Sequence, residues 1–367
     1  MSTDPSAVHC RCFFRTRSVS RDRSHGEQLA GAPPQMFIMG SKRKNRDESA
    51  WARALSFPNW SCHNLSQFVP STVMTDLKPI FRWINRFLPP KGREFTHFAY
   101  AGVKSLTGIP LKRKLFGNKA DLVPPLHLMQ DGNRDYKEFK QNGIVVFNLF
   151  RSFGLKPTDR ILDIGCGIGR KTIPLLDFLT TGSYEGIDPV QGQIKWCSER
   201  ITPRYPNVRF HWVDLWSRYY NPNGKIMSSE YVFPFADGEF DFVILSSVFT
   251  HMYSADMLHY ISEISRLLKP GGGGWVTFFL LNPESEALIA GRKSSVNLVF
   301  EAEDGCKADN ADRMETAVGH QEALVLQAFQ RRGIRVEIKY GSWCGRAIEG
   351  ERANEYSYQD FVRLTRT

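Results

Sequence analysis

The stretch Arg160-Ile-Leu-Asp-Ile-Gly-Cys-Gly-Ile-Gly169 decides the fold of this chain, because it joins a short apolar run to a glycine-rich turn. The residues that follow, 170–179, have the periodicity of a helix. Gly165 and Gly167 let the backbone turn tightly and approach a ligand closely, since neither has a Cβ. A strand, a glycine turn and a helix in this order predict the first unit of an open α/β sheet with a nucleotide-like ligand at the turn.

Strand-like and helix-like patterns alternate along the rest of the C-terminal two-thirds. Strands are expected at 160–164, 183–187, 208–213, 240–245, 275–281, 334–340 and about 359–364, and helices at 140–153, 170–179, 191–201, 255–268 and 321–332. This alternation predicts an α/β fold with a Rossmann-like, doubly wound seven-stranded sheet, mostly parallel with an antiparallel last strand. Residues 282–318 are expected to be an insertion without an assigned structure.

The spacing of the glycines narrows the choice of ligand. Dinucleotide-binding turns read G-x-G-x-x-G and use a helix N-terminus to hold a pyrophosphate. Here the spacing is G-x-G-x-G, and Asp163 stands two residues before the first glycine. A carboxylate in that place repels a pyrophosphate but suits a ligand with a cationic amine, which favours S-adenosylmethionine over NAD.

Acidic residues also end the second and third expected strands. Asp188 could accept hydrogen bonds from both hydroxyls of a ribose, as in other nucleoside-binding sheets, or it could cap the following helix. Asp214 could accept the adenine amine with Leu215 or Trp216 against the ring, or it could be a turn residue at the surface.

A fourth region completes the set of motifs. It reads Phe233-Pro-Phe-Ala-Asp-Gly-Glu-Phe-Asp241, followed by a strand and then by Ser246-Ser-Val-Phe-Thr-His-Met252. Together with the glycine turn, this region resembles a class I S-adenosylmethionine-dependent methyltransferase of the broad small-molecule group, types 11 and 25. The resemblance is close over 160–281 and extends over 139–367 by topology.

The resemblance implies a set of cofactor contacts. The methionine part of S-adenosylmethionine would be cradled by Asp163, Gly165, Cys166, Gly167 and Gly169. The ribose would be held by Asp188, the adenine by Asp214 and Leu215, and the face near the sulfonium would be lined by Ser246 and Ser247.

The residues on the acceptor side are less clearly marked. His251 lies on the loop after the fourth strand and is predicted either as a general base or substrate ligand, or as a residue that merely lines the site. Predicted substrate contacts are Tyr253, Asn282, Trp343 and Arg346, although the last two could instead form a packed turn. No Asn/Asp-Pro-Pro-Tyr motif follows the fourth strand, which disfavours methylation of nucleic-acid bases.

The N-terminal third is strongly basic. Residues 1–120 hold 20 Lys and Arg against 7 Asp and Glu, whereas 121–367 hold 28 against 31. We expect 1–73 to be a disordered basic extension. The alternatives are an organelle-targeting presequence, or a stretch upstream of a true start at Met74.

Residues 74–138 are expected to form a basic helical segment before the methyltransferase domain at 139–367. Within it, the apolar residues of 77–88 fall on one helical stripe with Lys and Arg beside it. Such a helix packs on the main domain or lies at a membrane surface or a lipid-linked substrate. Residues 77–114 are therefore a predicted contact with a membrane surface or a polyanion.

The composition limits the other classes of protein. No run of 18 apolar residues predicts an integral membrane span, and the seven cysteines include no C-x-x-C pair. The run His9-Cys-Arg-Cys12 lacks a second ligand pair, so no metal site is predicted. Free cysteines suit the cytoplasm, with peripheral attachment to the inner face of the membrane as a further option.

The sequence thus predicts transfer of a methyl group from S-adenosylmethionine to an oxygen or nitrogen of a small-molecule, sugar or glycan, or lipid-linked acceptor. One alternative is an RNA methyltransferase that uses the basic N-terminal arm. Two less favoured alternatives are an NAD-dependent oxidoreductase and a non-catalytic protein that binds S-adenosylmethionine.

Overall fold

A computed structural model describes residues 108–367, with gaps at 130–132, 134, 304, 313 and 349–357. The expected extension at 1–73 and the expected helix at 77–88 lie outside these residues. Among the helices that are described, none is both long and apolar enough to cross a membrane.

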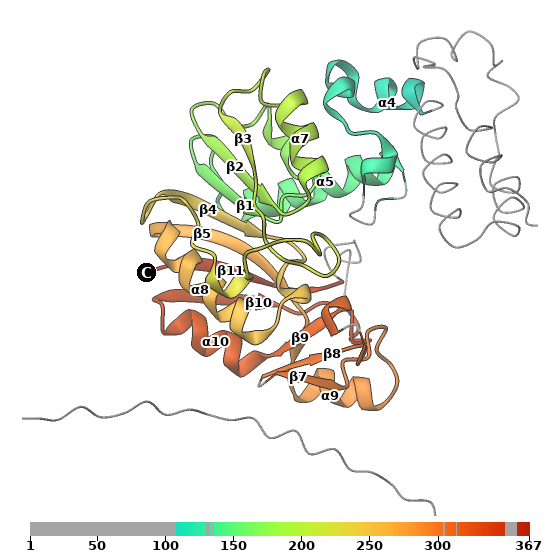
Figure 1. Cartoon of the computed structure of the whole chain (residues 1–367), viewed down its shortest axis with the longest axis vertical. Helices are drawn as coiled ribbons and strands as arrows, with labels where there is room; N and C mark the ends of the chain where they lie inside the picture. Colours follow the sequence, from blue (N-terminus) through green and yellow to red (C-terminus); the bar gives the residue numbers. More distant parts are fainter. Residues whose placement is uncertain (1–107, 130–132, 134, 304, 313, 349–357) are drawn as a thin grey trace, which may run out of the picture. The chain divides into compact units, whose positions relative to one another are not determined.

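The main sheet has seven strands in the order β10-β11-β5-β4-β1-β2-β3 (Figure 1). Their bounds are β1 Arg160–Ile164, β2 Ser183–Asp188, β3 Val208–Trp212, β4 Phe240–Leu245, β5 Leu268–Phe278, β10 Ile334–Lys339 and β11 Asp360–Arg366. All neighbours are parallel except β11, which runs antiparallel to both β5 and β10. The predicted fold class is therefore confirmed.

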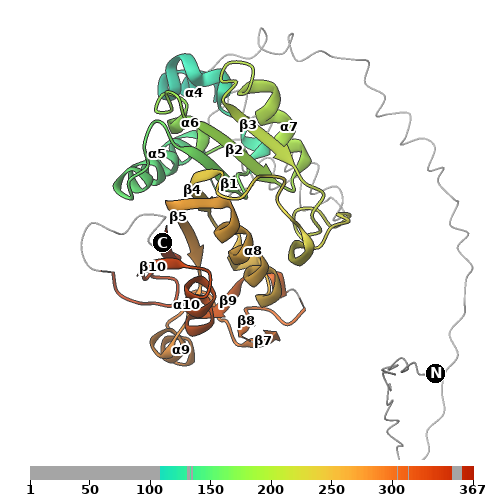
Figure 2. The same cartoon turned by 90° about the vertical axis from the view of Figure 1, so that its left-hand side faces the viewer.

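Helices cover both faces of this sheet, α5, α6 and α7 on one face and α8 and α10 on the other (Figures 1 and 2). The helices are α4 Ile109–Phe116, α5 Tyr136–Ser152, α6 Thr172–Leu175, α7 Gln191–Arg200, α8 Ser254–Leu267, α9 Pro283–Ala290 and α10 Glu322–Gln330. Because successive side chains of a strand point to opposite faces, Ile161 packs toward the α5 layer and Leu162 toward the α8 layer.

Short 3-10 turns connect several of these elements. They are η2 Gly117–Leu122, η3 Leu126–Leu128, η4 Ser228–Glu230, η5 Phe249–His251 and η6 Met314–Thr316. The turns η5 and η6 matter most for function, because His251 and Glu315 both reach the cavity described below.

Two expected elements differ in length from those in the structure. The helix expected over 170–179 is only the four-residue α6, and β5 begins at Leu268 although a glycine run at 271–274 predicts a break there. Within the run, the neighbours of Gly272 and Gly274 leave no room for a side chain, so these two positions of the strand require glycine. An ideal Cβ on Gly274 would lie 2.7 Å from the carbonyl oxygen of Val243 on β4.

The insertion expected at 282–318, to which no structure was assigned, contains α9 and forms a small second sheet with the residues that flank it. Its order is β6-β9-β8-β7, with β6 Leu280–Leu281, β7 Phe300–Glu303, β8 Cys306–Ala308 and β9 Val318–Gln321. Strands of two to four residues are too short for an alternating pattern to be recognised, which explains why the sequence did not predict them.

Phe150 on α5 joins that helix to the sheet, and its loss is expected to destabilise the domain. Its ring is 0% exposed and lies 5.7 Å from Phe242 and 5.5 Å from Trp275, centroid to centroid. Phe150→Ala should lower the free energy of unfolding in urea by about 3–5 kcal/mol. The control Phe300→Ala removes a ring that is 41% exposed and should change that free energy by about 0.5 kcal/mol or less. Equal losses in the two variants would contradict this account of the core.

Candidate active site

A cavity of about 410 Å³ opens at the carboxyl ends of the parallel strands, where the strand order reverses between β1 and β4. Ligands of open α/β sheets bind at this position. The lining comes from the glycine turn after β1, the end of β2, the loop after β3, the loop after β4 and the start of α8. Glu315 of the insertion and Gln359 before β11 complete it.

The glycine turn forms one wall, and its shape requires glycine. Gly165, Gly167 and Gly169 have φ angles of 75°, 58° and 81°, which side chains disfavour. An ideal Cβ on Gly165 would also lie 2.5 Å from Cγ2 of Val248. Of the predicted turn contacts, Gly165, Cys166 and Gly167 line the cavity. Gly169 does not line it.

The backbone N–H groups of this turn are already used inside the protein. Those of Gly165 and Cys166 donate to the carbonyl of Ile187, and that of Gly167 donates to Oδ2 of Asp188 at 2.8 Å. A pyrophosphate at a glycine turn needs free N–H donors. These three N–H groups are therefore not available to a pyrophosphate, and what they leave to a ligand is close approach of the backbone.

Asp163 lies beneath the turn and outside the cavity lining. Its carboxylate is 0% exposed, pairs with Nζ of Lys171 at 3.0 Å and accepts from the hydroxyl of Tyr184 at 2.7 Å. Burial raises the pKa of Asp163, although Lys171 opposes this shift. Lys171 also donates to the carbonyl of Gly165 at 3.1 Å and does line the cavity. The structure thus places a lysine between the predicted carboxylate and the ligand space.

Asp188 ends β2 and faces the cavity, as the predicted ribose contact requires. Its two oxygens accept from the N–H groups of Gly167 and Val190 at 2.8 and 2.9 Å. Burial raises the pKa of this carboxyl to about 6. A carboxylate offers about four acceptor positions, so two remain for ribose hydroxyls. The bond to Val190 shows that Asp188 also stabilises the turn before α7.

The loop after β3 separates the two predicted adenine contacts. Leu215 is buried and lines the cavity, together with Trp216 and Tyr220. Asp214 does not line it, since its Oδ1 accepts from Nδ2 of Asn221 at 3.1 Å within the same loop. For Asp214 the structure therefore agrees with the alternative of a turn residue.

The loop after β4 brings Ser246, Ser247 and His251 to the opposite wall. The Nδ1 atom of His251 lies 2.9 Å from the carbonyl oxygen of Glu315. A carbonyl only accepts hydrogen bonds, so Nδ1 carries the proton and Nε2 keeps a lone pair in the neutral ring. Burial lowers the pKa of His251 below its usual 6.5. The ring is therefore neutral at pH 7, with Nε2 as its basic atom.

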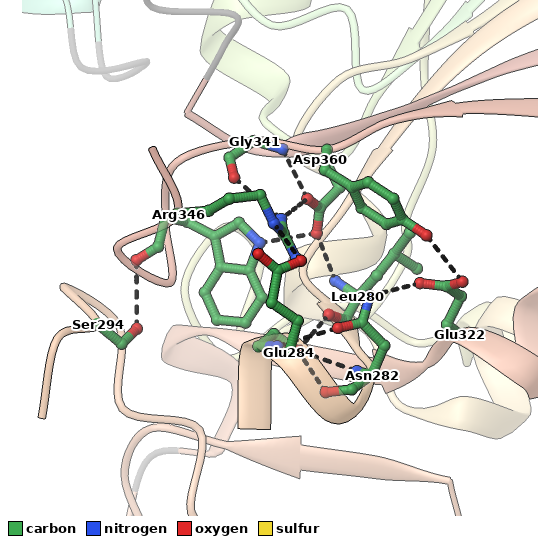
Figure 3. A network of polar contacts seen from close by, with 11 residues as sticks. Leu280, Asn282, Glu284, Ser294, Glu322, Gly341, Arg346 and Asp360 are labelled. Carbon is green, nitrogen blue, oxygen red and sulfur yellow. Dashed lines mark hydrogen bonds and ion pairs between the residues drawn. The ribbon is translucent and has the colours of Figure 1, made fainter. Parts of the chain in front are cut away.

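The four predicted substrate residues lie in two different places. Tyr253 lines the cavity, whereas Asn282, Trp343 and Arg346 do not and belong to a separate polar network (Figure 3). Asn282 caps α9 by accepting from the N–H of Ser285 at 2.9 Å. This arrangement corrects the expected contact of these three side chains with a substrate.

Trp343 and Arg346 form the packed turn that the sequence left open as an alternative. The indole of Trp343 is 0% exposed, and its Nε1 donates to Oδ2 of Asp360 at 2.7 Å. Arg346 pairs with Glu284 at 2.8 Å and with Oδ1 of Asp360 at 3.3 Å. Both side chains therefore bind the carboxylate of Asp360 and do not line the cavity.

Several lining residues were missing from the predicted site. They are Arg170, Lys171, Gln193, Ser217, Tyr220, Asp256, Tyr260, Glu315 and Gln359. The sequence could have indicated Arg170 and Lys171 as site residues, because they directly follow the glycine turn. It could also have indicated Gln359, because that residue stands at the start of the expected last strand. No feature of the sequence indicated Glu315 as a site residue, because it lies in the insertion whose strands were not recognised.

Residues 161–272 match the family model of the methyltransferase domain. This part of the chain is a methyltransferase domain. The match covers the glycine turn, Asp188, His251 and the end of α8, and it confirms the resemblance to class I S-adenosylmethionine-dependent methyltransferases. The predicted cofactor, S-adenosylmethionine, is confirmed with it.

Curated relatives share the same part of the chain. An uncharacterized methyltransferase from Schizosaccharomyces pombe is 30% identical over 118 residues, which are 32% of this chain and 39% of that protein. The sterol 24-C-methyltransferase of the same yeast is 30% identical over 37% of this chain and 32% of its own length. A tRNA N(3)-cytidine methyltransferase from Xenopus tropicalis is 29% identical over 32% of this chain and 33% of its own length. The chain thus matches less than two-fifths of each relative.

The solved structures to which the chain is similar are more distant in sequence. A methyltransferase from Methanosarcina mazei has 20% identity and a TM-score of 0.40, covering 59% of this chain and 96% of that one. The magnesium protoporphyrin IX methyltransferase of Synechocystis has 16% identity and a TM-score of 0.39, covering 73% and 99%.

The raised pKa of Asp188 makes binding of S-adenosylmethionine dependent on pH. Below about pH 6 the carboxyl becomes protonated and loses acceptor positions for the ribose. The dissociation constant measured by calorimetry should therefore rise as the pH falls below 6, by at most about tenfold per pH unit. Asp188→Asn should bind weakly with no such dependence. The control Asp177→Asn, at a side chain that is 72% exposed, should follow the wild type. A flat profile for the wild type would contradict the assignment.

Proposed function

We propose that this chain transfers a methyl group from S-adenosylmethionine to an oxygen or nitrogen of a small-molecule, sugar or lipid-linked acceptor. The observation that carries the proposal is the neutral His251, with its basic Nε2, in the same cavity as the glycine turn and Asp188. A donor site and a proton acceptor in one enclosed space are what methylation of a protonated oxygen or nitrogen requires.

The donor side is supported by the residues around the glycine turn. When bound, S-adenosylmethionine would supply a methyl carbon on a cationic sulfur. The acceptor's lone pair would attack this carbon, and the sulfur would leave with the electrons of the broken bond. Asp188 would hold the ribose hydroxyls, and Leu215 would pack against the adenine. Lys171 and Arg170 line the same wall, where they would attract the carboxylate of the methionine part.

The acceptor side would use His251 to remove a proton. As the new bond to oxygen or nitrogen forms, the proton on that atom passes to Nε2 of His251. The carbonyl of Glu315 stabilises the resulting cation, because its oxygen already accepts from Nδ1. Holding donor and acceptor in line supplies much of the remaining acceleration.

The names of the relatives do not indicate which acceptor this chain methylates. One is named for a sterol carbon and another for a cytidine nitrogen of tRNA, at nearly equal identity. The choice therefore rests on the cavity, which is concave and lined mainly by apolar surface, as small-molecule sites are. Methylation of RNA through the basic N-terminal arm stays an alternative that the following experiment separates.

Incubation with radiolabelled S-adenosylmethionine and a fractionated cell extract should put label into the small-molecule, glycan or lipid pool. Asp188→Ala should abolish labelling because the donor is no longer held, whereas the control Asp177→Ala should label at the wild-type rate. Label in the RNA pool would support the alternative. Labelling by Asp188→Ala at the wild-type rate would overturn the assignment of the donor site.

His251 should determine the pH dependence of methyl transfer. His251→Gln should lower kcat by about 10²–10⁴-fold, the usual contribution of a general base. Because burial lowers the pKa of His251, the wild-type rate should fall with acid only below pH 6.5. The control His259→Gln changes a histidine outside the cavity lining, bonded to the carbonyl of Tyr231, and should keep the wild-type profile. An unchanged kcat for His251→Gln would show that this residue only lines the cavity.

A further inference from the structure

Gln359 reaches the cavity from a distant part of the chain. It immediately precedes β11, whose first residue, Asp360, pairs with Phe278 at the end of β5. Because β11 is antiparallel to β5, its beginning lies at the carboxyl edge of the sheet, where the cavity is. Gln359 lines the cavity, and its Oε1 accepts from Oγ of Ser247 at 3.1 Å.

Ser247, the partner of Gln359, has an unusual backbone conformation. Its φ is 55°, in the left-handed region that residues other than glycine rarely adopt. It is held there by a bond from its N–H to Oγ1 of Thr277 at 2.7 Å and by the bond to Gln359. Strain of this kind concentrates at functional sites.

Asp360, the next residue, is the centre of a buried cluster that does not reach the cavity (Figure 3). We call Leu280, Gly341, Trp343, Arg346 and Asp360 the Asp360 cluster. The carboxylate is 0% exposed and accepts from the N–H groups of Leu280 and Gly341 at 2.8 and 2.7 Å. It also accepts from Nε1 of Trp343 at 2.7 Å and from Nη1 of Arg346 at 3.3 Å.

The cluster also fixes the backbone of Gln359 itself. Gly341 lies so close to Tyr358 and Gln359 that an ideal Cβ on it would overlap their carbonyl groups. The N–H of Trp343 donates to the carbonyl of Tyr358 at 2.9 Å. Residues on both sides of the Gln359 peptide are thus held, and its side chain is aimed at Ser247.

We propose that Gln359 binds the methyl acceptor and that the Asp360 cluster positions it to do so. The inference rests on the proposed function and adds a specificity residue to it. Oε1 is engaged by Ser247, whereas the Nε2 group has no hydrogen bond to the described residues, and the residue lines the cavity. The N–H groups of Nε2 donate to an oxygen of the acceptor, so the acceptor has a hydroxyl, ether or carbonyl oxygen beside the atom that is methylated.

The first experiment needs no acceptor and uses the full chain with methyl-¹³C-labelled S-adenosylmethionine. Gln359→Ala should shift the methyl resonance of the bound donor, because the side chain faces the same space. The control Gln330→Ala, at an exposed end of α10, should leave it in place. An unshifted resonance in Gln359→Ala overturns this inference alone, whereas failure of the wild type to bind the donor overturns the proposed function.

The second experiment measures transfer to the extract fraction that the wild type labels. Gln359→Ala should lower kcat/KM by about tenfold to a hundredfold through KM, the effect of one lost hydrogen bond to substrate, with donor affinity unchanged. Gln359→Glu keeps the shape but cannot donate, so it should lose as much. Full activity of Gln359→Glu would contradict donation by the amide.

The role of the cluster is tested through Arg346, with melting temperatures recorded for each variant. If Arg346 acts through Gln359, Arg346→Ala should shift the donor methyl resonance, and Arg346→Lys should partly restore it. The loss in kcat/KM of the double variant with Gln359→Ala should then equal that of Gln359→Ala alone. Additive losses would show that Arg346 is only structural.

Discussion

The ion pair between Lys171 and the buried Asp163 is the interaction on which the active site depends. It neutralises a carboxylate at the end of the central strand, and the same lysine holds the carbonyl of Gly165. Removing one partner of such a buried pair typically costs about 3–5 kcal/mol, because the other charge is left uncompensated. Lys171 holds the turn in place, and N–H groups of the turn bond to the carbonyl of Ile187 and to the carboxylate of Asp188 at the end of β2. In the wall that results, the N–H groups of Gly165, Cys166 and Gly167 are already bonded and are not available as donors to a pyrophosphate.

Much of the fold could be predicted because strand-like and helix-like patterns alternate along the C-terminal two-thirds of the sequence. The bounds of β1 and β4 agree with the expectation residue for residue. The errors occurred where a local signal competed with packing. The expected strand began only at 275, after the glycine run at 271–274, yet β5 begins at Leu268 and Gly274 packs so closely on β4 that it has no room for a side chain. The second sheet was missed because its strands are too short to show a period.

The residues of the site also fall into those that could be predicted from the sequence and those that could not. Asp188 and His251 could be found because they follow strands whose ends must meet at one edge of the sheet. Asp163 and Asp214 were placed on the correct loops, but the sequence does not show that Lys171 and Asn221 occupy their carboxylates. Trp343 and Arg346 were recognised as a group of interest, yet their partner is Asp360. Contacts between side chains far apart in sequence decide these cases, and no local pattern encodes them.

The position of β11 has a consequence for how the protein is made. This strand is the last in the sequence but lies inside the sheet, between β5 and β10. During synthesis the earlier strands emerge first, and folding proceeds from the N-terminal side. Until residues 360–366 leave the ribosome, β5 and β10 have unpaired edges of the kind that invite aggregation. The part of the cavity lining that Gln359 supplies is also absent until then.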